Sequence, residues 1–217
     1  IRSACQSFRD LGLESAGVVA VRVDDPLLHI TACLALHRMG IVNISVYGQE
    51  PPFEDVFKIG ATLTDRIGLR SHFGRQVPLK PDYFYAKVDP QQSYQGFKPD
   101  QLCRITLSSG TTSTPKAIGS TARATNERIV AAYRSLKLVP WDRVMCLVNL
   151  NSGYGFGRVA QALSYGHTVV FADTAVSALR MISRYNVDLL VANPQHLREM
   201  VEAHRAEPML LGSLLSL

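Results

Sequence analysis

The chain has 217 residues, of which 47% are hydrophobic, and this apolar content is ample for a folded core. Its 23 basic and 18 acidic residues give a formal net charge of +5 and are dispersed without runs of like charge, so we expect no nucleic-acid partner. No apolar run approaches the roughly 18 residues of a membrane span, and the start lacks the order of a signal peptide, so we expect a cytoplasmic protein with no membrane span.

The first half of the chain predicts alternating strands and helices. Residues 17–24 (GVVAVRVD) form a β-branched run typical of a strand, and Asp25 and Pro26 after it are a common helix start. That helix should run to Met39 and end at Gly40. The further expected elements are a strand at 41–47, a short helix at 51–59, strands at 61–64 and 82–88, and a polar loop at 90–101.

The second half continues this alternation. We expect a strand at 102–108, a helix at 122–137, and three strongly apolar strands at 144–148, 168–172 and 188–191, which is typical of a sheet covered on both faces. The later helices carry apolar stripes made by Val176, Leu179 and Ile182 and by Leu197, Met200, Val201 and His204. The pattern predicts a layered α/β fold with mostly parallel sheets flanked by helices.

Residues 105–116 (ITLSSGTTSTPK) follow a strand with hydroxyl side chains, a glycine, a proline and a lysine. Hydroxyls, backbone amides and lysine are the donors that phosphate oxygens accept from, at about 2.8 Å. Gly110 lets the backbone approach a ligand closely, and Pro115 stiffens the exit before Lys116. The segment matches neither the GxxxxGK[ST] nor the GxGxxG pattern. From composition alone, a phosphate-binding loop and an ordinary flexible loop remain equally open.

With its flanks PDQL and Ala117-Ile118, this segment resembles the phosphate loop of the adenylate-forming enzymes, namely acyl-CoA synthetases, peptide-synthetase adenylation domains and luciferases. That loop usually has a Thr-Ser-Gly-Thr-Thr-Gly-x-Pro-Lys-Gly core; here Ser113 and Ala117 replace two glycines and Ser108 replaces a threonine. LGLESAGVVAVRVDDP, ACLALHRMGIVNISVYG, GRVAQALSYGHTVVFAD and ISRYNVDLLVANPQHLREMV resemble further family segments in the correct order. The resemblance implies that residues 1–217 are part of the large N-terminal domain, divisible into lobes 1–100 and 101–217.

The resemblance also implies a ligase that joins a carboxylic acid to ATP, releases pyrophosphate and passes the acyl group to the thiol of CoA or of a carrier protein's phosphopantetheine. The residues implied to bind the ATP phosphates are Ser108, Ser109, Gly110, Thr111, Thr112, Ser113, Thr114 and Lys116. Of these, Thr111, Thr112 and Lys116 are the expected catalytic residues, because they would neutralise charge as the carboxylate attacks the α-phosphorus. Magnesium (Mg2+) would arrive with ATP, held mainly by phosphate oxygens and water.

Residues 148–157 (VNLNSGYGFG) occupy the position of the family loop that lines the acyl pocket. Many members have a histidine or a large aromatic residue near its start, where this chain has Asn149 and Asn151. Asn149, Asn151 and Tyr154 are therefore the expected substrate-binding residues. A glycine-rich turn entering a helix is the alternative, with Tyr154 and Phe156 in the core.

The cysteines and histidines indicate no metal site. Cys5, Cys33, Cys103 and Cys146 are far apart and form no CxxC pair, which predicts reduced, mostly buried thiols without a disulfide framework. The six histidines show no metal-ligand spacing.

Both ends of the chain, Ile1 and the apolar PMLLGSLLSL, are typical of a piece of a longer protein. The family's adenine-stacking segment, ribose-binding Asp, hinge and C-terminal lid lysine are not found in the sequence, so we expect the chain alone to be inactive. Two alternatives to an active ligase remain: a non-catalytic relative used for binding or regulation, and an unrelated nucleotide-binding domain. The unrelated domain would place residues 108–116 away from the carboxyl edge of a sheet. Neither the acid nor the oligomeric state follows from the sequence.

Overall fold

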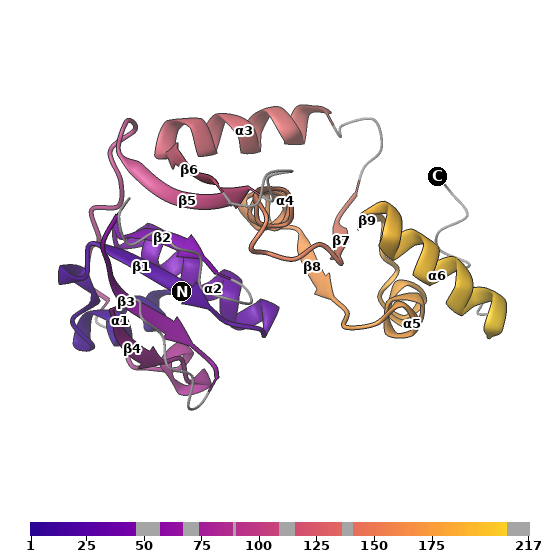
Figure 1. Cartoon of the computed structure of the whole chain (residues 1–217), viewed down its shortest axis with the longest axis horizontal. Helices are drawn as coiled ribbons and strands as arrows, with labels where there is room; N and C mark the ends of the chain where they lie inside the picture. The colour runs from indigo at the N-terminus through magenta and orange to yellow at the C-terminus, as the bar shows by residue number, and fades with distance from the viewer. Residues whose placement is uncertain (47–56, 67–73, 89, 109–115, 136–140, 208–217) are drawn as a thin grey trace. The chain divides into compact units, whose positions relative to one another are not determined.

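The structure is a computed structural model that describes residues 1–46, 57–66, 74–88, 90–108, 116–135 and 141–207 (Figure 1). The chain divides into two units, Ile1–Asn126 (unit 1) and Glu127–Leu217 (unit 2). The lobe boundary expected near residue 100 remains a prediction. None of the described helices is long and apolar enough to cross a membrane.

Unit 1 is built on a six-stranded sheet, here called sheet A. Its strands are β1 (Val18–Arg22), β2 (Val42–Ser45), β3 (Ile59–Thr64), β4 (Arg75–Pro78), β5 (Leu102–Ser108) and β6 (Lys116–Thr121). Its helices are α1 (Arg2–Asp10), η1 (Leu13–Ser15), α2 (Pro26–Arg38) and η2 (Pro81–Phe84), and α3 (Ala122–Ser135) begins in unit 1 and ends in unit 2.

The strands of sheet A lie in the order β4-β3-β1-β2-β5-β6. All neighbours are parallel except β5 and β6, which form an antiparallel hairpin. The carboxyl ends of β1 to β5 therefore share one edge of the sheet, which is where ligands of open α/β sheets bind.

Local signals explain the β1–α2–β2 segment, which has the predicted form. The Asp25 carboxylate caps α2 by accepting a hydrogen bond from the Leu28 N–H at 2.9 Å, and Pro26 occupies the first turn. The helix ends before Gly40, whose φ of +73° favours glycine. A Cβ at Gly40 would also lie 2.7 Å from the Gly96 carbonyl oxygen, so two reasons exclude a side chain there.

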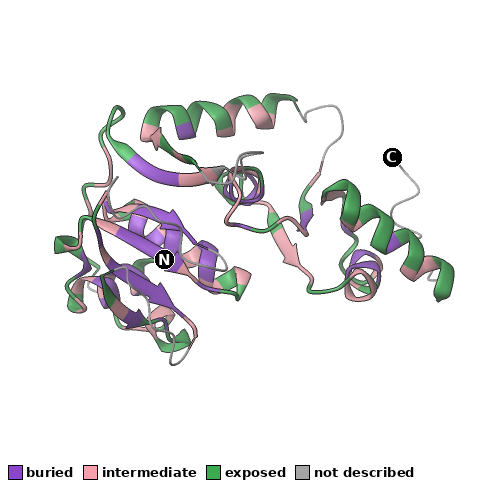
Figure 2. Ribbon diagram, viewed as in Figure 1, coloured by how far each residue is buried: buried purple, intermediate pink, exposed green. Residues whose placement is uncertain are grey.

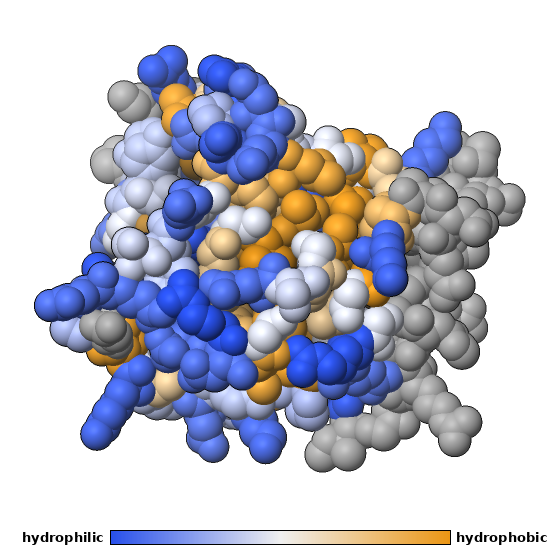
Figure 3. Space-filling view, turned by 90° about the vertical axis from the view of Figure 1, so that its left-hand side faces the viewer, coloured by the Kyte–Doolittle hydropathy of each residue, from blue (hydrophilic) through white to orange (hydrophobic). Residues whose placement is uncertain are grey.

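The two faces of sheet A differ in polarity. Because side chains alternate along a strand, Ile44 and Ile105 lie on one face in an apolar cluster with Ala20, whereas Asn43 and Arg104 lie on the other. Figure 2 shows that the buried residues of unit 1 concentrate in the central strands and α2. The face of the molecule drawn in Figure 3 shows an apolar area that is bordered in part by hydrophilic side chains.

Unit 2 contains a parallel three-stranded sheet in the order β8-β7-β9. Its elements are β7 (Arg143–Cys146), α4 (Gly153–Ser164), β8 (Thr168–Phe171), α5 (Ala175–Tyr185), β9 (Leu189–Val191) and α6 (Pro194–Ala206). Part of each predicted stripe lies in one core, where Leu179 and Ile182 of α5 and Met200 of α6 are buried with Met145 of β7. Val176 and His204, also expected in the stripes, are half-buried and lie outside this core. Leu197 and Val201 of the α6 stripe are exposed.

Two predictions on local structure were wrong. Residues 82–88 are not a strand, because Pro81 begins a 3-10 turn in which the Tyr83 N–H donates to the Lys80 carbonyl, and residues 85–88 after this turn are in neither a helix nor a strand. The helix expected at 51–59 cannot include Ile59, which begins β3; residues 51–56 lie outside the described part. Leu136 and Lys137, expected at the end of α3, also lie outside it.

Candidate functional site

The β5–β6 hairpin fixes both ends of the hydroxyl-rich loop. Ser108 is the last residue of β5 and pairs in register with Lys116, the first residue of β6, whose side chain is exposed. Because β5 runs parallel to β2, Ser108 lies at the carboxyl edge of sheet A. This is the placement expected of a phosphate-binding loop and contrary to that expected of the unrelated domain.

The middle of the loop falls outside the described residues, and the predicted phosphate ligands Ser109, Gly110, Thr111, Thr112, Ser113 and Thr114 all belong to it. Strand β6 was missed by the sequence analysis. Its sequence, KAIGST, is half exposed and has no apolar run, so its signal is the neighbouring strand β5 and not its own composition.

A buried polar network connects β5 to β2 and α2. Arg104, which is 2% exposed, donates from Nη1 to Asn43 Oδ1 and from Nη2 to Ser45 Oγ, both at 2.7 Å. Its Nη1 also lies 3.5 Å from Cys33 Sγ of α2. One guanidinium thus ties the loop-bearing strand to β2 and to α2.

His29 completes this network. Its Nδ1 lies 3.1 Å from the Val23 carbonyl oxygen, so Nδ1 carries a proton, and its Nε2 lies 2.9 Å from Ser45 Oγ. Ser45 Oγ accepts from Arg104, which leaves its single proton for His29 Nε2 or for the sulfur of Cys33 3.9 Å away. The Ser45 hydroxyl can therefore donate its hydrogen bond to either the His29 imidazole or the Cys33 sulfur, depending on which of them is the better acceptor.

The charges in this network alter the pKa of both titratable groups. Burial opposes ionisation of the Cys33 thiol, but the charges of His29 and Arg104 outweigh it and lower its pKa from 9.0 to about 6. Burial also opposes the charged form of His29, and the negative charge on Cys33 outweighs it, so the pKa of His29 is raised. A thiolate at Cys33 is a counterion for the buried Arg104 guanidinium.

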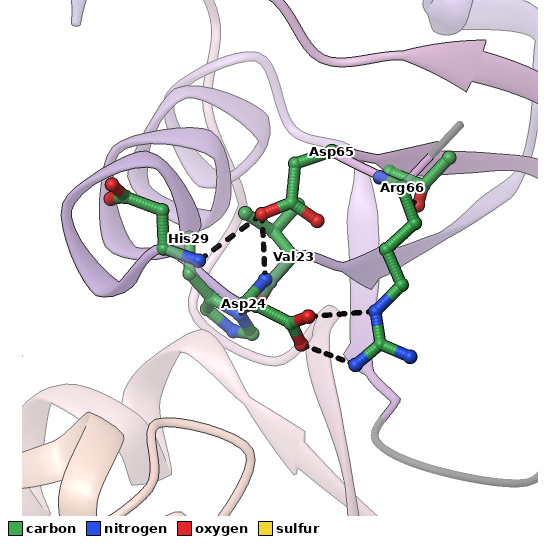
Figure 4. A network of polar contacts seen from close by, with 7 residues as sticks. Val23, Asp24, His29, Asp65 and Arg66 are labelled. Atoms are coloured by element: carbon green, nitrogen blue, oxygen red, sulfur yellow. Dashed lines mark hydrogen bonds and ion pairs between the residues drawn. The ribbon is translucent and has the colours of Figure 1, made fainter. Parts of the chain in front are cut away.

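Carboxylates occupy the helix start at the same edge of sheet A (Figure 4). Asp65, just after β3, accepts from the backbone N–H groups of Asp24 and Asp25 at 2.9 and 3.1 Å. Arg66 makes two hydrogen bonds of 2.7 Å to the Asp24 carboxylate and holds its pKa below the usual range. The carboxylates of these neighbours thus occupy the N-terminus of α2. Their negative charge makes this helix start an unfavourable site for a phosphate.

The segment entering α4 is a tight turn. Asn149 is exposed; its Oδ1 accepts from the Asn151 N–H at 2.8 Å, and its carbonyl oxygen accepts from Ser152 Oγ at 2.8 Å. Ser152 Oγ in turn caps α4 at the Gly155 N–H. A Cβ at Gly155 would lie 2.5 Å from the Asn149 carbonyl oxygen, so this approach requires glycine.

The structure separates the predicted substrate-binding residues. The side chain of Asn149 is engaged within the turn, whereas Asn151 Oδ1 is buried and has no hydrogen-bond partner among the described residues. Tyr154 is 51% exposed, whereas Phe156 is buried, so the core alternative applies to Phe156 but not to Tyr154.

Tyr154 belongs to a groove of about 210 Å³ in unit 2, here called the α3–α4 groove. It is lined by Arg128, Ile129 and Ala132 of α3 and by Gly153, Tyr154, Gly157 and Arg158 of α4. The guanidinium of Arg158 lies 5.4 Å from the centre of the Tyr154 ring, within the range of a cation–π contact. Sequence analysis missed both arginines, because only the packing of α3 on α4 brings them together.

All four cysteines are free and buried, as predicted. The described residues contain no group of three His, Cys, Asp or Glu side chains arranged to hold a metal ion.

A protein-family model described as AMP-binding enzyme matches residues 62–217. A curated relative, the anguibactin system regulator of Vibrio anguillarum, is 24% identical over 180 residues, which are 79% of this chain and 17% of that protein. The chain therefore spans about a sixth of the curated relative that it matches.

Solved structures share the fold. The chain is similar to o-succinylbenzoate coenzyme A synthetase (MenE) from Bacillus subtilis in complex with AMP, with a TM-score of 0.81 and 17% identity over 98% of this chain and 57% of the synthetase. A nonribosomal peptide synthetase matches with a TM-score of 0.75 and 19% identity over 98% of this chain and 24% of its own. The luciferase-like enzyme of the mealworm Zophobas morio also matches with a TM-score of 0.75, at 15% identity over 98% of this chain and 56% of its own. The predicted α/β fold is thus that of the N-terminal part of adenylate-forming enzymes.

Proposed function

The chain belongs to the AMP-binding enzyme family, and from this premise we propose that the protein containing it activates a carboxylic acid with ATP. The acid's carboxylate oxygen attacks the α-phosphorus of ATP, the bond to the bridging oxygen breaks, and acyl-adenylate and pyrophosphate result. A thiol of CoA or of carrier-protein phosphopantetheine then attacks the acyl carbon and displaces AMP. The observation that carries the proposal is the register of Ser108 with Lys116 at the carboxyl edge of sheet A.

In this proposal the hydroxyls and amides of residues 108–114 and the ammonium of Lys116 bind the β- and γ-phosphates. They neutralise the charge that the departing pyrophosphate gathers and hold it in line with the attacking carboxylate. Hydroxyl and amine donors fit phosphate oxygens. Mg2+ would accompany ATP on its phosphate oxygens and water and would supply further charge neutralisation.

The turn from Asn149 to Tyr154 is proposed as a wall of the acid-binding pocket. Asn151 Oδ1 supports this role, because a buried acceptor without a partner among the described residues is rare in folded proteins and is often explained by function. Asn149 would act indirectly, since its side chain shapes the turn.

A second candidate is a non-catalytic relative used for regulation. The name of the curated relative from Vibrio anguillarum, a system regulator, favours it, as do Ser113 and Ala117 in place of the family's glycines. Serine at position 113 rarely adopts the positive φ values that are open to the glycine usual in the family.

The test is ATP–pyrophosphate exchange by the full-length protein with fatty, aromatic and amino acids. Lys116→Ala should reduce exchange at least about 100-fold if the ammonium neutralises transferring phosphate, since each such donor contributes roughly 10²–10³ in rate. Lys87→Ala is the control, because Lys87 is exposed and lies outside helices and strands. A folded protein that exchanges with no acid, or whose exchange is indifferent to Lys116→Ala, would favour the regulatory candidate.

A further inference from the structure

We propose that the α3–α4 groove binds an anionic group of the substrate, so that the acid carries a second negative charge besides the carboxylate that reacts. This inference rests on the proposed function and names its substrate class: dicarboxylic acids, or acids with another anionic substituent. The groove, with a volume of about 210 Å³, holds about seven water volumes, which is room for a short chain or a ring bearing one such group.

The shape of the groove places two cations beside an apolar floor. Ile129 and Ala132 of α3 and Gly157 of α4 contribute little or no polar side-chain surface. A Cβ at Gly157 would lie 3.9 Å from Nη2 and 4.0 Å from Nε of Arg128, so the guanidinium of Arg128 lies directly beside this glycine. Absence of a side chain at Gly157 leaves the space next to the guanidinium open for a ligand.

Neither arginine is neutralised within the described part of the chain. Arg158 donates to the neutral Gln161 Oε1 at 3.2 Å and lies against the Tyr154 ring, and no ion pair involves it or Arg128 among the described residues. Other arginines in the structure, such as Arg9 and Arg66, do pair with carboxylates. Two guanidiniums that face one groove without an acidic partner there are suited to a carboxylate or phosphate, which each can bind with two parallel hydrogen bonds.

The helix α4 adds to this positive potential. Gly153 and Tyr154 line the groove and are the first two residues of α4, so the groove opens at the positive end of a 12-residue helix. Contact with the Tyr154 ring fixes the Arg158 guanidinium, which lowers the entropy lost when an anion binds.

The groove also adjoins the proposed acid-binding turn in sequence and structure. Asn151 and Tyr154 belong to the same turn and first helical residues, and Tyr154 lines the groove. An acid whose reacting carboxylate extends toward ATP would therefore present its distal end to this helix start. A distal anion would form ion pairs there, whereas a purely apolar tail would gain nothing from the two guanidiniums.

The decisive experiment compares phthalate with benzoate, which share a ring and differ by one carboxylate, on the full-length protein. Equilibrium dialysis measures binding and ATP–pyrophosphate exchange measures turnover. We expect phthalate to bind at least tenfold more tightly than benzoate at low salt, and this preference to shrink as salt screens the charges. Arg128→Met with Arg158→Met should abolish the preference, whereas Arg134→Met, an exposed arginine of α3 outside the groove, should preserve it.

The outcomes separate this inference from the proposed function. Exchange with benzoate-type acids alone, or a phthalate preference unchanged in the double variant, would overturn the groove assignment and leave acid activation standing. Phthalate binding that depends on both arginines, without exchange, would support the groove and count against activation. If the double variant alters only the KM for CoA or a phosphopantetheine thiol, the groove serves the acceptor and the substrate inference is wrong. The salt dependence of the wild type decides the case if the double variant fails to fold.

Discussion

Replacing Arg104 by methionine should destabilise unit 1 by about 3–5 kcal/mol. The substitution removes a guanidinium that makes two hydrogen bonds of 2.7 Å, to Asn43 and Ser45, and leaves both partners buried. Hydrogen bonds to charged groups contribute roughly 1.5–3 kcal/mol each, and breaking a buried charged network costs about 3–5 kcal/mol. Methionine fills a similar space, so the loss reports the polar contacts more than a cavity.

Few backbone pairs connect β5 to β2, so the loss of the Arg104 side chain should also affect the loop that follows β5. Its register with β2 consists of Asn43 with Arg104 and Ile44 with Ile105, and beyond them β5 depends on the hairpin with β6. The Arg104 side chain adds ties to β2 and α2. Without it, the loop ends at Ser108 and Lys116 should be held less firmly, so the KM for ATP should rise.

The buried cysteines provide the assay. Labelling of Cys103 by a thiol reagent at increasing urea concentration reports the opening of unit 1, and labelling of Cys146 reports unit 2. Arg104→Met should shift the Cys103 curve and not the Cys146 curve. The matched control is Arg123→Met, which removes an exposed ion pair with Asp100 and should cost less than about 1 kcal/mol. Equal shifts for the two substitutions would refute the role assigned to the buried network.

Two further predictions concern the pH dependence of unit 1 and the turn before α4. Because the folded pKa of Cys33 is about 6 and the usual value is 9.0, the thiolate contributes stability above pH 9 that is lost as the pH falls through 6, up to about 4 kcal/mol at 1.36 kcal/mol per unit. The raised pKa of His29 works in the opposite sense, with stability that is present below pH 6.5 and lost as the pH rises through its folded pKa. Because the Cys33 thiolate is what raises the pKa of His29, Cys33→Ser should remove both contributions and flatten the pH profile of stability. Urea midpoints of unit 1, monitored by limited proteolysis at pH 6, 7.5 and 9, check this prediction. Identical pH profiles for the wild type and Cys33→Ser would contradict it. Gly155→Ala should destabilise unit 2 by about 1–3 kcal/mol, because its Cβ would lie 2.5 Å from the Asn149 carbonyl oxygen, whereas Gly157→Ala, with contacts no closer than 3.9 Å, should be tolerated. Urea midpoints from Cys146 labelling measure both, and equal midpoints would count against the close approach.

Much of the fold could be predicted because its signals are local. The β-branched run of β1, the Asp25 cap, Pro26 and the glycine after α2 each act within a few residues, and the structure places that strand and helix where they were expected. Strand β6 has no such signal, since its pairing with β5 and not its own sequence makes it a strand. The aromatic alternation at 82–88 misled the prediction, because Pro81 favours a turn and the segment has no partner strand among the described residues.

The Arg104 network was accessible to a closer analysis of the pattern. In β2, Asn43 and Ser45 are two residues apart and so share a face, and His29 and Cys33 are four residues apart on α2. Both sets of polar groups lie on otherwise apolar elements, which indicates a buried polar network between helix and sheet. What the sequence could not supply is the third element, because Arg104 follows Ser45 by 59 residues.

The proposed reaction likewise has one part that is the same for every acid and another part that selects the acid. Triphosphate is the same ligand whatever acid is activated, so one continuous loop between paired strands can bind it, and such a loop is recognisable from consecutive residues. A selective pocket must instead differ with the shape and charge of the acid, and it is assembled from separate elements: Arg128 and Arg158 are 30 residues apart and meet only because α3 packs beside α4. The substrate of a member of this family is therefore more reliably inferred from side chains that converge on a groove than from its phosphate loop.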